Sequence, residues 1–471
     1  MTPYTYGGYD KFICSIYFDA LFLGVVDIYT FGQVFSVVAS VLFWCAAALV
    51  LVRICMRAAG LDDIRLIKLP LLRAAVGRPV SRLLSENKGI HIYAKIIIFG
   101  VCVRLVMLLL GYMFLHIEGL DASFAGVFNS FNRWDAGHYL RLAEHGFSYT
   151  EDGRPIFVVF FPLYPYLIRL VHVFVRNYLA AAYIVSFASY LAGLCYLYRL
   201  VRLDFSESTA WWAVVLISIF PHSIFFGAPH TESLFLLTTV MTLYYIRAHK
   251  WLFAGIAGAF ASATRMVGII LIAAAAAEFV MHYQIFTLMK KGKWKGFFDL
   301  IAKKGLSILI MLMGTLVYLF INWRITGDPL RFLYFQETHW HNGFLIFGAA
   351  MRMQFSGIMP YLGVMSVPHT RFYFAVPNIL GFGFTVWMIV YASLRRHNAG
   401  YIVYALGYTF VSFSMVWLLS GGRYAAALVP SFIFLADYVD RKPHRRVIVP
   451  LIFILLLLPI LRAYVLGGWV M

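Results

Sequence analysis

Long apolar runs are the feature that most constrains how this chain can fold. Residues 31–52, 178–198 and 373–394 carry no charged side chain, and each run is close to the ~20 residues that a helix needs to cross a bilayer. Hydrophobic residues make up 62% of the 471 positions and charged residues 13%, a composition outside the range of soluble domains. The sequence therefore predicts an all-α polytopic membrane protein.

The basic residues are concentrated in a few loops between the apolar runs. The formal net charge of +18 could indicate a nucleic-acid partner. The basic clusters in 53–95, 290–304, 395–396 and 441–446 are instead typical of cytoplasmic loops under the positive-inside rule. We therefore expect membrane lipids as neighbours and no nucleic acid as a partner.

The charge balance alternates along the chain and sets its organisation. Residues 1–93 should hold an N-terminal anchor span and a basic cytoplasmic segment, and 94–471 should form the main transmembrane domain. In that domain, 116–176 is expected to be an outer loop with juxtamembrane helices, because its first part carries more acidic than basic residues. Residues 324–372 should form a second outer loop, and the whole alternation predicts about 11–13 transmembrane helices.

Two apolar stretches do not fit a single straight span. Residues 158–176 contain Pro162 and Pro165, which favours a short helix at the membrane surface. Residues 251–283 are too many for one comfortable span, and Arg265 interrupts them near the middle. We expect two short spans that turn near Arg265 at the outer face.

One polar stretch, residues 131–147, stands out directly after an apolar run. If it is helical, steps of 100° place Asp135, His138 and His145 within about a quarter of the circumference, with Glu144 on the opposite face. A carboxylate flanked by imidazoles at the membrane surface can act as a general base.

A structural interpretation of the same stretch stays open. Asn132 could cap the helix, with Asp135 at the third position of that cap. His138 and His145 could be ordinary residues of a polar helix face. Metal ligation by these side chains has no recognisable spacing signature, so no metal is assigned, although a divalent ion is left open.

Other ionisable residues are expected at the same outer boundary of the membrane. A charge in a membrane helix is expensive, and the residues concerned are Arg265, His222, His230, Glu232 and Arg423. Each alone could be a snorkelling side chain or a helix-end charge. Together they should converge on the loop that carries the polar stretch, where arginine is the natural clamp for a phosphate.

Several of these motifs together resemble the PIG-V family, which comprises GPI mannosyltransferase 2 and its prokaryotic relatives. The similarity covers about residues 94–440, and its most specific part is the polar stretch. The matching motifs are Trp134-Asp135-Ala136-x-His138, Ala143-Glu144-His145-Gly146, Phe160-Phe161-Pro162-Leu163-Tyr164-Pro165, Thr231-Glu232-Ser233-Leu234-Phe235, Ala263-Thr264-Arg265-Met266-Val267-Gly268, Val376-Pro377-Asn378 and Arg423.

The resemblance implies a glycosyltransferase of the GT-C fold. Such an enzyme transfers mannose, with inversion, from dolichyl or polyprenyl phosphate mannose to a glycolipid acceptor, as in the second mannose of a GPI-type core. It implies that Asp135 is the base, supported on the acceptor side by Trp134, His138 and His145. The donor phosphate or lipid would be bound by Arg265, Arg423, His222, His230 and Glu232.

Two departures from the family pattern bear on this implied site. Many GT-C enzymes carry a second acid in the first outer loop, whereas Gly137 stands two residues after Asp135, which puts metal assistance in doubt. His230 replaces the tyrosine expected before the Thr-Glu pair. No cofactor is expected beyond the lipid-linked sugar donor.

The residues alone leave alternatives open. A GT-C enzyme could use another sugar or a prokaryotic glycolipid or protein acceptor, and a transporter of lipids or solutes would have a bundle of similar size. The resemblance implies an active site on the lumenal or extracytoplasmic face, in the endoplasmic reticulum of a eukaryote or the plasma membrane of a prokaryote. A small membrane subunit is also compatible with it.

Overall fold

Helices and short connections account for nearly all of the described chain. The structure, a computed structural model, describes residues 26–59, 90–151, 153–349, 368–415, 418, 420–468 and 470. Within these ranges the only extended pairing is two isolated β-bridges, Glu151 with Arg154 and Phe344 with Met415. The prediction of an all-α fold is therefore confirmed. The expectations for residues 1–25, the middle of the basic segment and part of the second outer loop lie outside the described residues.

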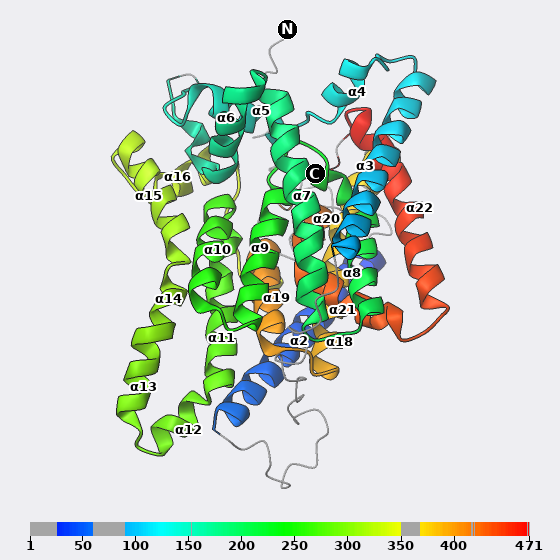
Figure 1. Cartoon of the computed structure of the whole chain (residues 1–471). Helices are drawn as coiled ribbons and strands as arrows, with labels where there is room; N and C mark the ends of the chain where they lie inside the picture. The colour runs from blue at the N-terminus through cyan, green and yellow to red at the C-terminus, as the bar shows by residue number, and fades with distance from the viewer. Residues whose placement is uncertain are drawn as a thin grey trace.

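The helices are arranged in chain order as a single bundle (Figure 1). Their bounds are α2 Val26–Ala58, α3 His91–Ile117, α4 Phe124–Ser130, α5 Asp135–His145, η3 Ile156–Val159, α6 Leu163–Val175, α7 Tyr178–Arg202, α8 Glu207–Ile219, η4 Ser223–Phe226, α9 Glu232–Arg247, α10 Trp251–Thr264, η5 Met266–Ile270, α11 Leu271–Tyr283, α12 Ile285–Lys290, α13 Trp294–Leu300, η6 Ile301–Gly305, α14 Leu306–Leu309, α15 Leu312–Thr326, α16 Arg331–Thr338, α18 Pro368–Leu394, α19 Ala399–Ser412, α20 Gly421–Ala427, α21 Val429–Asp440 and α22 Arg445–Val465.

Fewer helices than expected are long enough to cross a membrane. Six described helices meet the length and composition of a span, and a seventh span is formed if the bent pair Trp294–Leu309 and Leu312–Thr326 is one unit. The sequence predicted about 11–13 spans because short apolar runs were counted as crossings. Several of these runs form helices of 10–17 residues instead. The protein is a multi-pass membrane protein whose bundle mixes long and short helices.

The two irregular stretches fold as their composition suggests. Pro162 and Pro165 stand at the start of α6, where a missing backbone N–H costs no helical hydrogen bond. The long run 251–283 is broken after Thr264, and Arg265 adopts an extended conformation between α10 and η5. This break releases the Arg265 side chain from the helical repeat.

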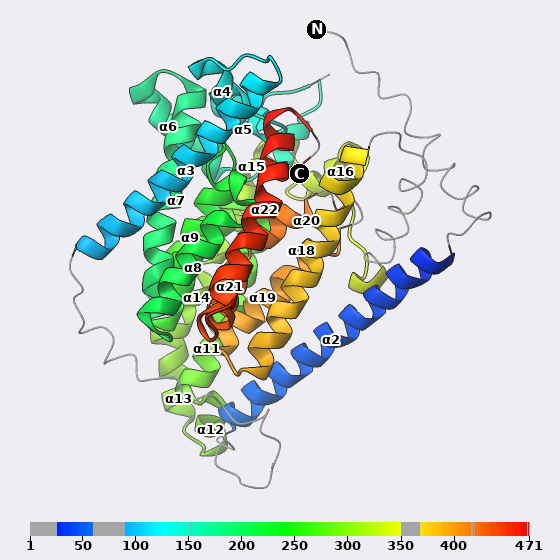
Figure 2. The ribbon, with the colours of Figure 1, turned by 90° about the vertical axis from the view of Figure 1, so that its right-hand side faces the viewer.

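The loops gather at opposite ends of the bundle. Figures 1 and 2 show α4, α5, α6 and α16 at one end, and α12 and α13, next to the basic residues of 290–304, at the other. The acidic outer loop and the basic loop are thus on opposite ends, as the charge pattern predicts.

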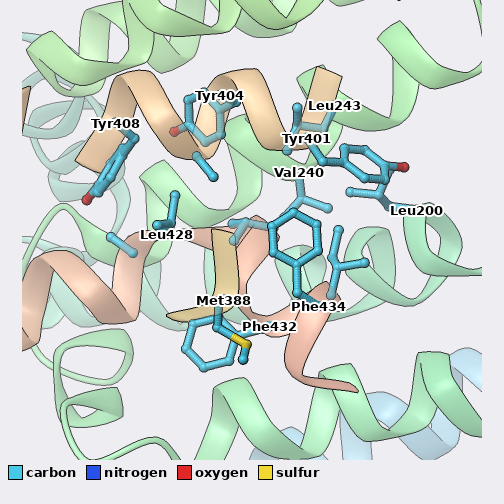
Figure 3. Close-up of a cluster of buried hydrophobic side chains, with 14 of the residues drawn as sticks. Leu200, Val240, Leu243, Met388, Tyr401, Tyr404, Tyr408, Leu428, Phe432 and Phe434 are labelled. Carbon is cyan, nitrogen blue, oxygen red and sulfur yellow. The ribbon is translucent and has the colours of Figure 1, made fainter. Parts of the chain in front are cut away.

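Close packing in the centre of the bundle fixes the helices that carry polar residues at its ends. Figure 3 shows Tyr404 and Tyr408 of α19 among Val240 of α9, Met388 of α18 and Phe432 of α21, all of them buried. In a lipid environment such contacts act through dispersion and shape rather than through expulsion of water. They hold α9 and the α20–α21 pair in one relative position.

Candidate active site at the α5 end of the bundle

A cluster of alternating charges joins four separate segments of the chain. Arg423 of α20 donates from Nη1 to Asp135 Oδ2 at 2.8 Å and from Nε to Glu232 Oε1. Arg265 donates from Nη1 to the same Glu232 oxygen. Glu232 is 0% exposed and Arg423 is 4% exposed, whereas the Asp135 side chain is 27% exposed. The cluster therefore runs from a fully buried carboxylate to one that is open to its surroundings.

Arg423 is positioned by an asparagine that ties two segments together. Asn378 of α18 donates from Nδ2 to the carbonyl of Leu418 at 2.7 Å, and its Oδ1 accepts from the backbone N–H of Gly421 at 2.7 Å. A Cβ atom at Gly421 would lie 2.8 Å from that same Oδ1. Only glycine allows this approach, and α20 begins there.

A second glycine brings His222 against the start of α20. A Cβ atom at Gly422 would lie 2.2 Å from Cε1 of the His222 ring. His222 is 3% exposed, and its Nε2 has no hydrogen-bond partner in the described part of the chain. The ring thus occupies the space next to the residue that precedes Arg423.

Glu232 is the first residue of α9, where the positive end of the helix dipole favours a carboxylate. The following Ser233 hydroxyl donates to the carbonyl of Phe226 at 2.7 Å, which fixes the entry of the chain into the helix. Glu232 Oε2 accepts no hydrogen bond from any described residue. Glu232 thus serves as the shared counterion of two arginines and still has one acceptor oxygen unused.

The backbone before Asp135 is in an uncommon conformation that neighbouring side chains hold in place. Trp134 has a φ of 47° and precedes α5, with no side-chain cap on the helix; a bulky residue pays for a positive φ. Its ring packs edge-on against Tyr464 at 5.0 Å between centroids. Since Trp134 is the cap residue, the alternative in which Asn132 caps the helix is wrong.

Tyr464 of α22 also connects this backbone to His230. Its hydroxyl donates to the carbonyl of Phe131 at 3.0 Å and lies 3.1 Å from His230 Nε2. Because the single hydroxyl proton is used on Phe131, His230 Nε2 must be the donor. His230 Nδ1 then carries the free lone pair, and it has no partner among the described residues.

The two groups of α5 that face this region have shifted acidities. Burial acts to raise the pKa of Asp135, but the positive charge of Arg423, with His230 and a hydrogen bond from Arg423, outweighs it and holds the pKa below its ordinary value. Burial lowers the pKa of His138, although the nearby Asp135 charge opposes that effect. At neutral pH the site therefore presents an ionised Asp135 and a neutral His138.

His138 lies in an aromatic enclosure. The centroids of Phe157, Phe160 and Trp340 are 5.2, 5.3 and 5.4 Å from that of its ring, and Trp340 belongs to the second outer loop. The Nδ1 atom of His138 has no hydrogen-bond partner within the described ranges. This enclosure joins the two predicted outer loops one helical turn after Asp135.

His145 lies apart from the charge cluster. It stacks on Tyr149 at 5.2 Å and lies 3.7 Å from the Glu144 carboxylate, with a side chain that is 49% exposed. Ten residues of α5 separate it from Asp135, about 15 Å along the helix axis. The expected separation of His145 from Glu144 is wrong, because both stand in the last turn, where neighbouring long side chains reach one another.

The described residues contain no group of three or more His, Cys, Asp or Glu side chains arranged for a metal ion. The oxygens of Asp135 and Glu232 that face the cluster instead accept from guanidinium groups. Asn378 and Tyr464 are the positioning residues that sequence reasoning did not assign, and the motif containing Pro377-Asn378 was the available signal for the first of them.

Comparisons with known proteins agree with the motifs of the polar stretch. Residues 155–302 match the model of the family described as dolichyl-phosphate-mannose-protein mannosyltransferase. The chain is 24% identical to GPI alpha-1,6-mannosyltransferase 2 of Cricetulus griseus over 277 residues, 48% of this chain and 54% of that protein. The human protein of the same name is 23% identical with the same coverage. The chain thus spans about half the length of the curated relatives it matches.

Similar solved structures are also found. The archaeal oligosaccharyltransferase AglB of Archaeoglobus fulgidus, in complex with an inhibitory peptide and a dolichol-phosphate, is 14% identical, with a TM-score of 0.41 and coverage of 79% of this chain and 56% of that one. The same enzyme tethered to an acceptor peptide has a TM-score of 0.42 at 14% identity, covering 79% of this chain and 55% of that one.

The fold and the buried charge cluster define a multi-pass helical membrane protein with an ionisable site at one end of its bundle. The sequence matches identify its relatives more narrowly. The chain belongs to the PIG-V family, the family of GPI mannosyltransferase 2. The family-model match includes Glu232 and Arg265 but neither Asp135 nor Arg423.

Proposed function

We propose that the protein transfers mannose from dolichyl or polyprenyl phosphate mannose to a glycolipid acceptor, with inversion at the anomeric carbon. The observation that carries the proposal is the Asp135–Arg423–Glu232–Arg265 cluster, which presents a carboxylate beside two fixed cations. The printed names of the relatives support the sugar and the type of donor.

Asp135 is the general base of this reaction. A sugar hydroxyl is a poor nucleophile at neutral pH, so a carboxylate within hydrogen-bond reach must take its proton as it attacks. Asp135 is ionised at that pH, since Arg423 holds its pKa low, and it is the more exposed of the two carboxylates in the cluster. The hydroxyl oxygen bonds to the anomeric carbon from the face opposite the phosphate.

The two arginines stabilise the leaving group. As the bond between the anomeric carbon and the phosphate oxygen breaks, the electron pair stays on the lipid phosphate, and guanidinium groups are suited to bind that charge. Glu232 keeps Arg265 and Arg423 side by side against their mutual repulsion. His230 and His222 lie against the same segments as neutral polar groups.

Arg423 has a double role in this scheme. In the structure without donor its Nη1 atom is bound to Asp135, and this ion pair lowers the proton affinity of the base. A phosphate that takes over Nη1 leaves the Asp135 carboxylate free to accept a proton. Donor binding would thus raise the basicity of Asp135 where the acceptor hydroxyl arrives.

The expected acceptor is a glycolipid, and the reaction takes place on the lumenal or extracytoplasmic face. The aromatic enclosure around His138 is the surface of the outer loops closest in sequence to the base, and aromatic faces are suited to sugar rings. The test is reconstitution of the purified protein in liposomes with polyprenyl phosphate mannose, and separately with polyprenyl phosphate glucose. Mass spectrometry of GPI-precursor, prokaryotic glycolipid and peptide acceptors should show a gain of one hexose on a glycolipid, only with the mannose donor.

Other results would redirect the proposal. A peptide that gains the hexose would move the acceptor from glycolipid to protein. No transfer to any acceptor, with an intact protein, would contradict the transferase function itself.

A further inference from the structure

A second buried arginine lies within an apolar helix and has no role in the proposed chemistry. Arg104 stands near the middle of α3, whose bounds His91–Ile117 meet the length of a membrane span, and it is 4% exposed. A cation at such a position is expensive and is retained for a specific purpose. No acidic side chain in the described ranges forms a salt bridge with Arg104, so its charge is compensated by other groups.

Backbone carbonyls supply that compensation. Nη1 of Arg104 donates to the carbonyl of Ser223 at 2.6 Å, and Nη2 donates to the carbonyl of Ser218 at 2.9 Å. Nη2 also lies 3.4 Å from the hydroxyl of Tyr190, whose ring faces the guanidinium at 4.5 Å. The Tyr190 hydroxyl in turn donates to Ser218 Oγ at 2.8 Å.

The two carbonyls stand on either side of one turn. Ser218 is in the last turn of α8, where carbonyls have no intrahelical partner and the helix dipole is negative. Ser223 is the first residue of η4. The planar fork of arginine can bind two carbonyls that point in different directions, so Arg104 joins the end of α8 to the start of η4.

The joined turn forms one wall of the charge cluster. It carries His222, whose ring occupies the space beside Gly422, and η4 carries Phe225, whose ring faces the Arg423 guanidinium at 4.9 Å. A displacement of this turn would therefore shift the surface on which Arg423 rests.

We propose that Arg104 is a positioning residue that fixes the 218–226 turn against α20 and thereby aims Arg423 at the donor phosphate. The assignment of the phosphate rests on the proposed function, whereas the attachment of the turn does not. Arg104 acts through carbonyls and an aromatic ring and touches neither substrate.

The test compares Arg104→Lys with the wild type in two measurements. Lysine keeps the charge but is a compact donor without the planar fork. Hydrogen exchange followed by mass spectrometry should show faster exchange in peptides covering 218–231 and unchanged exchange in α19. In the transfer assay the KM for the donor should rise about tenfold or more while the KM for the acceptor stays the same, since small misplacements of a binding group cost much. Tyr190→Phe, which removes one weaker contact, should give a smaller change in the same direction.

Arg53→Lys is the matched control. Arg53 is also 4% exposed within an apolar helix, but its guanidinium donates to the carbonyls of Ser393 and His397. These lie at the other end of α18 from Asn378, about 22 Å away along that helix. The control should leave both the 218–231 exchange and the donor KM unchanged.

Two results would overturn the proposal: unchanged exchange at 218–231 in Arg104→Lys, or equal changes in donor and acceptor KM. If the wild type transferred no mannose, the proposed function would fail on that result alone. The exchange measurement would still decide whether Arg104 holds the turn.

Discussion

Arg423 and Asp135 are 288 positions apart in the chain and meet through a hydrogen bond of 2.8 Å. The first is nearly buried and the second is partly open, with side-chain exposures of 5% and 27%. Because Arg423 also binds Glu232, the pair connects the open edge of the site to its fully buried interior. The properties of Asp135 therefore depend on a residue near the far end of the chain.

The pH dependence of transfer should report this pair. Asp135 has a pKa held below its ordinary value of 3.8, so its ion pair contributes stability above that pH and loses it as the pH falls through the lowered pKa. Removing the cation in Arg423→Gln leaves burial to raise the pKa. The acid limb of kcat/KM for the residual activity should move to higher pH than in the wild type. An unmoved limb would contradict the pairing.

The Gly422 position should tolerate no side chain. In Gly422→Ala the new Cβ would lie 2.2 Å from the His222 ring, and such overpacking costs about 1–3 kcal/mol. We expect a lower melting temperature and a large loss of transfer, because α20 or the turn must shift. Gly296→Ala is the control, since a Cβ there meets nothing within 4 Å; equal effects in the two variants would contradict this account.

Glu232 should matter most as a counterion. Glu232→Ala leaves two buried guanidinium groups without their shared acceptor, and breaking a buried ion pair from one side costs about 3–5 kcal/mol. Glu232→Gln retains an oxygen acceptor and should lose less. Thermal unfolding in detergent would rank the three proteins as wild type, Gln, Ala, and a stable Ala variant would show that the arginines do not need this carboxylate.

A separate ion cluster should stabilise the protein without affecting the chemistry. Arg247 ends α9, at the other end of the helix from Glu232, and binds Asp204 at 2.7 Å and Glu278 at 3.1 Å. Arg247→Met leaves two carboxylates uncompensated and should lower the melting temperature. Measured on folded protein, both KM values should stay within about twofold, as expected for well-separated sites. A changed donor KM would mean that the two ends of α9 are coupled.

The sequence predicted the helical class, the break at Arg265 and the gathering of ionisable groups at one end. These follow from hydropathy and charge, which act locally and can be read from single segments. The span count was less successful, because a short apolar run has the same composition whether it crosses the membrane or ends inside the bundle.

The partners of the charged groups could not be predicted in the same way. Nothing in the local sequence indicates that Glu232 binds two arginines from distant segments. Arg104 had a visible signal, a lone cation in a span, but its acceptors are backbone carbonyls, which every residue carries. His145 followed the helical wheel as far as its face, yet the wheel gives no information on distance along the axis.

Transfer by Asp135→Asn measures the central claim most directly. The amide has nearly the same shape and can still accept from Arg423, but it cannot take a proton, so the variant should insert, fold and bind donor while mannose transfer falls by about 10²-fold or more. Glu144→Gln, which changes a half-exposed acid on the same helix, should transfer mannose at the wild-type rate. Asp135→Asn with near wild-type transfer would contradict the account.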